Sequence, residues 1–156
     1  MPRLDRLPEA NRKNLLALPV QVNDATPFVR LARPLAAARL AIVTTAGLHR
    51  RGDRPFGPAD QSYRLIAADT PTVDIVQSHT SLGFDRVAIM RDVNISYPVD
   101  RLRELVGRGV LGALAPHGYS FMGAQRDVAR IERETGPEVG RRLREEGVDA
   151  VLITPT

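Results

Sequence analysis

Short apolar runs separated by polar and glycine-rich clusters constrain the fold of this chain more than any other feature. Apolar runs of strand length lie at residues 39–45, 62–68, 73–77, 110–115 and 148–154. The first run, Arg39-Leu-Ala-Ile-Val-Thr-Thr45, is β-branched and almost continuously apolar, which is typical of a strand buried on both faces of a parallel sheet. Helical patterns separate several of these runs. The alternation predicts a single α/β domain, a parallel-sheet sandwich of the Rossmann-like or flavodoxin-like type.

The clearest helical pattern covers residues 98–106. Pro98 suits the first turn of a helix, Asp100 complements the positive end of the helix dipole, and Gly107 and Gly109 close the pattern. Its apolar residues fall on one face, which predicts packing against the core rather than a partner motif.

A second helix is expected to run from about residue 124 to Glu146. It is interrupted or restarted at Gly136-Pro137 and stopped by Gly147. The run at residues 86–90 is ambiguous between a buried strand and a turn of helix.

Residues 1–34 are expected to form an N-terminal arm, and residues 35–156 the α/β domain. The arm contains a short helical pattern from Glu9 to Leu18, and its first residues lack the apolar core of a signal peptide. No apolar run approaches the ~18 residues of a membrane span. These features predict a cytoplasmic protein that does not bind membranes.

The net charge of +4 comes almost entirely from arginine, because Lys13 is the only lysine. The arginines are interspersed with acidic residues, and few aromatic residues are present to stack on bases. We therefore expect a solvated, arginine-rich surface and no nucleic-acid partner.

The chain contains no cysteine, which excludes a disulfide framework, a thiol nucleophile and a cysteine-ligated metal in these residues. Its three histidines are His49, His79 and His117. A three-histidine metal site is conceivable, but hydrogen-bonded structural histidines are the commoner case, so no metal is expected.

Polar residues follow several of the predicted strands. In a parallel sheet, ligands bind at the carboxyl ends of the strands, so these residues can converge on one rim if the strand order permits. The candidates for this rim are Thr44, Thr45, Ser78, His79, His117, Ser120 and Thr154.

The segment 118–123, Gly-Tyr-Ser-Phe-Met-Gly, lies between a predicted strand and a predicted helix, as a nucleophile elbow does. Its spacing is one residue too long for the G-x-S-x-G motif. A serine hydrolase with Ser120 as nucleophile, His79 or His117 as base and Asp92 as orienting group is one hypothesis. The turn's N–H groups could also bind an anion, but no dinucleotide or P-loop motif supports a nucleotide cofactor.

The later half of the chain resembles a known family. The segments that carry the resemblance are Ser78-His-Thr-Ser-Leu-Gly-Phe-Asp-Arg86, Asp92-Val-Asn94, Pro98-Val-Asp-Arg-Leu-Arg-Glu-Leu105, Gly109-Val-Leu-Gly112 and Tyr119-Ser-Phe-Met-Gly123. They are similar to the selenoprotein B component of the glycine, sarcosine and betaine reductases and of D-proline reductase. The resemblance runs from about Leu35 to Thr156 and implies reductive cleavage of carbon–nitrogen bonds, or a related selenol redox reaction.

The resemblance also implies a set of residues that orient a substrate or partner around a nucleophile supplied elsewhere. On general grounds Asp85, Arg86, Asp92 and Asn94 are loop-capping and ion-pairing groups, but the resemblance makes them site-lining residues. The full set is Thr44, Thr45, Ser78, His79, Asp85, Arg86, Asp92, Asn94, His117, Tyr119, Ser120 and Thr154.

In the family, the strand that resembles residues 149–154 leads into a selenocysteine, or a cysteine in its place, followed by a final helix and strand. This chain stops at Thr156. We expect that a UGA codon was read as a stop, so that the C-terminal end is missing and the chain alone is inactive. The alternatives are that the sequence ends at an arbitrary boundary or that the protein is a genuinely short paralogue. An uncovered apolar sheet face would then promote dimerisation or poor solubility.

The leading functional expectation is a selenocysteine- or cysteine-dependent reductase with a small amino-acid-derived substrate. Its expected partners are reductase subunits or a thiol redox protein, with no cofactor in this chain besides the selenocysteine of the full-length protein. The alternatives are a non-catalytic scaffold or subunit, and the Ser120 hydrolase.

Overall fold

The computed structural model describes residues 3–17, 24–25, 29–81 and 86–155. The chain divides into two compact units, Met1–Arg30 and Leu31–Thr156. The first contains a 3₁₀ turn at Leu4–Arg6 and helix α1 (Glu9–Leu16), which matches the helical pattern seen in the sequence and buries none of its residues. No helix within the described residues is both long and apolar enough to cross a lipid bilayer.

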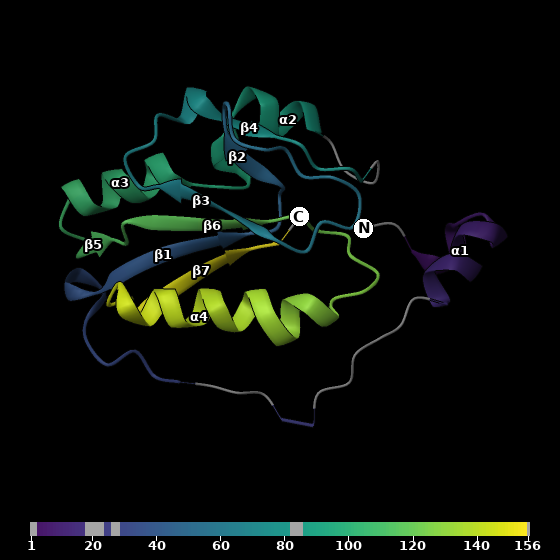
Figure 1. Ribbon diagram of the computed structural model, residues 1–156. Helices are drawn as coiled ribbons and strands as arrows, with labels where there is room; N and C mark the ends of the chain where they lie inside the picture. The colour runs from purple at the N-terminus through teal and green to yellow at the C-terminus, as the bar shows by residue number, and fades with distance from the viewer. Residues whose placement is uncertain (1–2, 18–23, 26–28, 82–85, 156) are drawn as a thin grey trace. The chain divides into compact units, whose positions relative to one another are not determined.

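The second unit is built on a five-stranded sheet whose strands are β1 (Arg39–Thr44), β3 (Tyr63–Ala67), β5 (Ala113–Leu114), β6 (His117–Phe121) and β7 (Ala150–Thr154). Strand β1 is central and pairs in parallel with β7 on one side (Figure 1). On its other side it pairs in parallel with β5 at its start and with β6 at its end. Strand β3 then pairs with β6 in the antiparallel direction. The α/β class is confirmed, with a mixed sheet in place of a wholly parallel one.

A separate antiparallel ribbon joins β2 (Leu48–Arg50) to β4 (Ile75–Gln77). Strand β4 accounts for most of the apolar run that the sequence places at 73–77. The ambiguous run that follows is helical and forms α2 (Arg86–Arg91).

The two larger helices cover opposite faces of the sheet (Figure 1). Helix α3 (Val99–Gly107) confirms the predicted helix to within one residue at each end, and it buries Val99 and Leu102. Helix α4 (Gly136–Glu145) packs Val139 and Leu143 against the other face.

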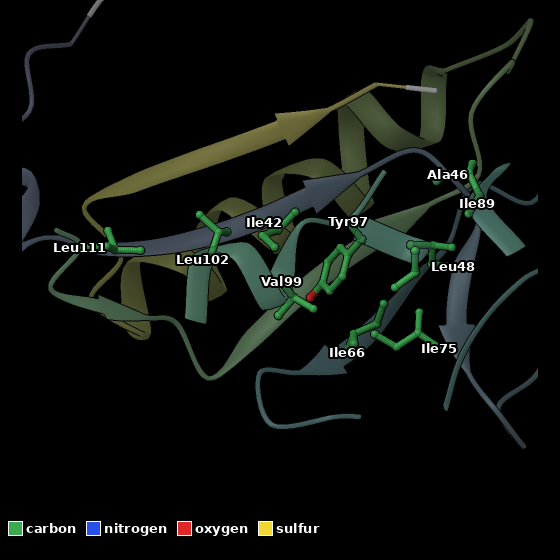
Figure 2. Packing of buried hydrophobic residues seen from close by; sticks show 11 residues of the cluster. Ile42, Ala46, Leu48, Ile66, Ile75, Ile89, Tyr97, Val99, Leu102 and Leu111 are labelled. Atoms are coloured by element: carbon green, nitrogen blue, oxygen red, sulfur yellow. The ribbon is translucent and has the colours of Figure 1, made fainter. Parts of the chain in front are cut away.

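The larger apolar core lies on the α3 face. Figure 2 shows Ile42 of β1, Ile66 of β3 and Tyr97 side by side with residues of α3. Tyr97 is 1% exposed and packs directly on Gly118 of β6. The absence of a side chain at Gly118 therefore makes room for an aromatic ring in the middle of the core.

Helix α4 is preceded by a π-helical turn, Ile131–Thr135, instead of the interruption that Gly136-Pro137 suggests in the sequence. The helical segment begins at residue 129, later than expected, and continues without a break into α4. Pro137 has no N–H to donate, and the N–H of Gly136 bonds to the carbonyl of Ile131, five residues back. The π turn thus allows the helix to continue through Pro137 without a break.

Replacing Gly136 by alanine should therefore destabilise the domain. A Cβ at this position would lie 2.5 Å from the Ile131 carbonyl oxygen, which is held inside the π turn. We expect the free energy of unfolding to fall by ~1–3 kcal/mol, as for other overpacked sites. Urea denaturation measures the change. Gly140→Ala is the matched control, because a Cβ there meets open space, and it should raise stability by ~0.5–1 kcal/mol through helix propensity. Equal effects of the two variants would contradict this account.

Candidate functional site

The carboxyl ends of β1 and β7 meet in register, with Thr44 beside Thr154. The Thr44 side chain is fully buried, and its hydroxyl lies 3.2 Å from the carbonyl oxygens of both Ser96 and Thr154. It also accepts a hydrogen bond from the N–H of Ala46. Thr44 therefore ties the end of the sheet to the segment that precedes α3.

Two hydroxyl groups beside Thr44 are buried without a hydrogen-bond partner among the described residues. They are Oγ of Ser96 and Oγ1 of Thr154. Buried hydroxyls normally form hydrogen bonds with protein or water, so these two form a polar cluster that can still bond to a further polar group. The sequence interpretation included Thr44 and Thr154 but missed Ser96, because nothing in its local pattern distinguishes it from a loop serine.

Gly47, which follows β1, connects this edge to the ribbon of β2 and β4 through its backbone. Its N–H donates to the carbonyl of Phe121, and its own carbonyl accepts from the N–H of Ser78. Its φ of +64° is in the left-handed region, and a Cβ would lie 3.1 Å from the backbone of His79. Gly47 thus brings the ribbon of β2 and β4 against the end of β6. The Ser78 hydroxyl accepts from the N–H of Phe56.

His79 is buried, with 2% of its surface exposed. Its Nδ1 accepts a hydrogen bond from the N–H of Ser81 at 3.1 Å, which places the ring proton on Nε2. Burial, and secondly the charge of Arg86, lower the pKa of His79 below its ordinary value. The side chain is therefore neutral at physiological pH and is arranged to donate from Nε2 rather than to accept a proton there.

Arg86 begins α2, and its guanidinium donates to the carbonyl oxygen of His79 at 3.2 Å. Arg86 therefore lies beside His79. Asp85, its predicted neighbour in the site, lies outside the described residues.

Ser120 lies beside Thr44 near the carboxyl end of β6, as expected for the rim, but it is within the strand and not on a strand-to-helix turn, so the predicted nucleophile elbow is wrong. Residues 117–121 form β6, which pairs with both β1 and β3. Ser120 is fully buried, and its Oγ accepts a hydrogen bond from the N–H of Leu48 at 2.8 Å. This contact anchors β2 to the sheet, and the geometry gives a hydrolase no support.

His117 lies at the opposite end of β6, so its predicted place on the carboxyl rim is also wrong. Its Nδ1 is 2.8 Å from Oε1 of Glu146, and the same oxygen accepts from the Tyr119 hydroxyl at 3.1 Å. Burial, and then the nearby Glu146 carboxylate, raise the pKa of Tyr119. The sequence interpretation missed Glu146. It lies 29 residues from His117 in the sequence, and only the packing of α4 against the sheet brings the two side chains into contact.

Asp92 and Asn94 form a capping network at the start of α3. The Asp92 carboxylate accepts from the backbone and side-chain N–H groups of Asn94. Asn94 also donates to Asp100 and accepts from its N–H, and Asp100 pairs with Arg103 at 2.7 Å. Hydrogen bonds from Asn94 lower the pKa of both aspartates. The described contacts of these residues fix the helix start.

The histidines do not gather into a metal site. His49 Nδ1 is bonded to the carbonyl of Arg50, and His79 and His117 lie at different ends of the sheet. Within the ranges that the structure describes, no three His, Cys, Asp or Glu side chains are arranged to hold a metal ion.

An open apolar groove of about 570 Å³ lies on the α4 face at the same carboxyl edge. Its floor is formed mainly by the ends of β1, β6 and β7, and α4 forms one wall. Residues that line it include Val43, Thr45, Phe121, Met122, Val151 and Ile153. The edge of the sheet thus combines a buried polar cluster on one side with an apolar surface on the other.

Comparison with known proteins gives a consistent assignment. The family model for glycine/sarcosine/betaine reductase selenoprotein B matches residues 11–156. The D-proline reductase subunit gamma of Acetoanaerobium sticklandii is 41% identical over 136 residues, which is 86% of this chain and 55% of that protein. The sarcosine reductase complex component B subunit beta of Peptoclostridium acidaminophilum is 29% identical over 88% of this chain and 32% of its own length.

The glycine reductase complex component B subunit gamma of Carboxydothermus hydrogenoformans is likewise 29% identical, over 89% of this chain and 33% of that protein. The chain therefore spans about half the length of the D-proline reductase subunit and about a third of the other two. No solved structure matches it. Because the family model covers the whole α/β domain, the chain belongs to the glycine/sarcosine/betaine reductase selenoprotein B family.

Proposed function

We propose that this chain forms one wall of the reaction site of a selenocysteine- or cysteine-dependent reductase that cleaves a carbon–nitrogen bond of D-proline or a similar amino-acid-derived substrate. The observation that carries the proposal is the 41% identity to a D-proline reductase subunit over 86% of the chain. The other relatives are named as reductases of sarcosine and glycine, so the C–N bond is the shared chemical feature.

The nucleophile comes from outside these 156 residues, since the chain has no cysteine. We place it beyond the carboxyl end of β7, next to Thr154. The unpartnered hydroxyls of Ser96 and Thr154 support this position, because each can form a hydrogen bond with a further polar group at the edge. A selenol is ionised at neutral pH and so needs no lowering of its pKa to attack, unlike a thiol.

The proposed reaction balances with a dithiol as reductant. Two electrons and two protons replace the Cα–N bond of D-proline with one C–H and one N–H bond, which opens the ring to δ-aminovalerate. The dithiol loses the same two electrons and two protons and becomes a disulfide.

A non-catalytic subunit is the second candidate. It is favoured by the absence of cysteine and by relatives that are named as subunits of complexes. In that case the chain contributes surface to a complex whose chemistry lies entirely in other polypeptides.

The decisive experiment determines the DNA sequence after the Thr156 codon and the mass of the protein made by its native host. We expect an in-frame UGA, an open frame beyond it, and a selenium-containing product heavier than 17.1 kDa. With a dithiol, that product should convert D-proline to δ-aminovalerate, whereas the 156-residue chain alone should not.

Variants then test the site itself. Thr154→Val in the heavier product should lower kcat, while Arg141→Ala, on the exposed face of α4, should leave it unchanged. Another stop codon with a native mass of 17.1 kDa would overturn the proposed position of the nucleophile and leave the non-catalytic subunit.

A further inference from the structure

His79 and its neighbours form the described part of the connection between β4 and α2. His79 is 2% exposed, and its backbone lies 3.1 Å from the position that a Cβ would take at Gly47. The N–H of Ser78 donates to the carbonyl of Gly47, and the Thr80 hydroxyl donates to Sδ of Met122 at 3.3 Å. Because Gly47 follows β1 and Met122 follows β6, these contacts hold the connection against the carboxyl edge of the sheet.

The imidazole of His79 closes a turn in the way that an asparagine side chain does. Its Nδ1 accepts a hydrogen bond from the N–H of Ser81, two residues later, at 3.1 Å. Asparagine side chains form the same bond in Asx turns. The histidine ring differs because only its neutral form has an acceptor nitrogen, whereas both nitrogens of the protonated ring are donors. Protonation therefore sets an N–H of the ring against the N–H of Ser81, and the bond is lost.

The surroundings of the ring also disfavour its protonated form. Burial, and secondly the charge of Arg86, keep the pKa of His79 below its ordinary value of 6.5. Among the described residues, Arg86 at the start of α2 is the charged group that acts on this titration. Its guanidinium is held beside His79 by the hydrogen bond to the His79 carbonyl at 3.2 Å. A proton on the ring thus breaks the turn and places a second cation beside Arg86.

We propose that protonation of His79 is an acid-sensitive switch that releases the connection between β4 and α2 from the carboxyl edge of the sheet. Above pH 6.5, the ordinary pKa of histidine, the ring is neutral whether the connection is closed or open, so the contacts are complete. As the pH falls below this value, the open form takes up a proton that the closed form excludes. Each pH unit then favours opening by up to ~10-fold, until the pH reaches the lower pKa of the closed form.

The switch acts on the edge that carries the candidate site. Gly47 and Met122 lose their contacts with the connection when it opens, and both adjoin Ala46, whose N–H donates to the Thr44 hydroxyl. We therefore expect this edge to be fully formed at neutral pH and loosened in mildly acidic solution. The inference goes beyond the proposed function, because it depends on the packing of His79 and not on any reductase reaction.

Hydrogen exchange from about pH 7.5 down to about pH 4.5 tests the switch. The measured quantity is the protection factor, which already corrects for the intrinsic effect of pH on exchange. For the Ser81 amide it should fall by up to ~10-fold per pH unit below pH 6.5, the ordinary pKa of histidine. For the Ala113 amide, which bonds to the Ala38 carbonyl at the opposite end of the sheet, it should stay constant. The experiment is made with the 156-residue chain and repeated with the protein from its native host.

His79→Asn is the decisive variant. The asparagine oxygen takes the position of Nδ1 and accepts from the N–H of Ser81, but it does not titrate in this range. The protection of Ser81 should therefore lose its pH dependence, whatever the smaller side chain does to overall stability. His117→Asn is the matched control, because it removes a titratable histidine at the other end of β6, and it should keep the pH dependence of the wild type.

An NMR titration of the His79 ring gives a second readout. Arg86→Met removes the neighbouring charge, so it should raise the pKa of His79 and reduce the total loss of Ser81 protection. A constant Ser81 protection factor across the pH range would overturn the proposal, as would the same pH dependence in wild type and His79→Asn. A parallel fall at Ser81 and Ala113 would overturn it too, because the domain would then unfold as a whole.

Discussion

Replacing Gly118 by alanine is expected to lower the free energy of unfolding by ~3 kcal/mol or more, at the upper end of the range for overpacked cores. A Cβ at this position would overlap the Tyr97 hydroxyl and lie 2.8 Å from Cζ of the same ring. Gly118 is held between β1 and β3 in the middle strand, and Tyr97 is 1% exposed. Neither the strand nor the ring has space to move, and urea denaturation measures the resulting loss.

Two further variants isolate the cause. Gly107→Ala should not lower stability, because a Cβ there meets no neighbouring atom. Tyr97→Phe in the Gly118→Ala background removes the oxygen that suffers the closest overlap, so it should restore part of the lost stability. A double variant that is less stable than Gly118→Ala alone would show that the hydroxyl is not the cause.

Alkaline pH should unfold the domain through Tyr97 and Tyr119. Both side chains are buried, and burial raises the pKa of each hydroxyl above its usual value of 10.0, with Glu146 adding to the effect at Tyr119. The unfolded chain ionises near pH 10 while the folded chain retains both protons. The stability from these groups is therefore complete below pH 10 and is lost as the pH rises above it. Each tyrosine contributes a slope of up to ~1.4 kcal/mol per pH unit.

Urea denaturation at pH values on either side of 10.0 measures this slope, and tyrosinate absorbance reports the ionisation. The summed slope of up to ~2.7 kcal/mol per pH unit is large beside a typical total stability of ~5–15 kcal/mol. Tyr97→Phe should reduce the slope by up to ~1.4 kcal/mol per pH unit, whatever it does to stability at neutral pH. An unchanged slope in that variant would mean that Tyr97 ionises as easily in the folded protein as in the unfolded one.

Gly118 also explains the main error in the sequence interpretation. The two glycines of the segment Gly-Tyr-Ser-Phe-Met-Gly at 118–123 locally favour a turn. The structure gives another reason for Gly118: the ring of Tyr97, 21 residues earlier, occupies the position that a side chain would take. By contrast, α3 was predicted almost to the residue, because Pro98 and Gly107 are local signals for a helix start and end. Boundaries encoded by neighbours in sequence were predictable, and those set by neighbours in space were not.

The same distinction applies to the candidate site. Thr44 and Thr154 were placed correctly at one edge because each ends an apolar run that is a strand. His117 was misplaced because its end of β6 depends on where that strand begins, and its partner Glu146 comes from a distant helix. Ser96 adds a buried hydroxyl that only the packing of the segment before α3 reveals.

The central position of β1 has a consequence for biosynthesis. Its partners β5, β6 and β7 all lie far along the chain, and the pairing of Leu40 with Ala150 spans 110 residues. During translation β1 therefore leaves the ribosome long before any strand exists to pair with it. Contacts of such sequence separation slow folding and leave apolar strands open to aggregation. Pairing of β1 thus waits until β5, β6 and β7 have been synthesised, and yield in cells should depend on chaperones that bind the nascent β1 segment.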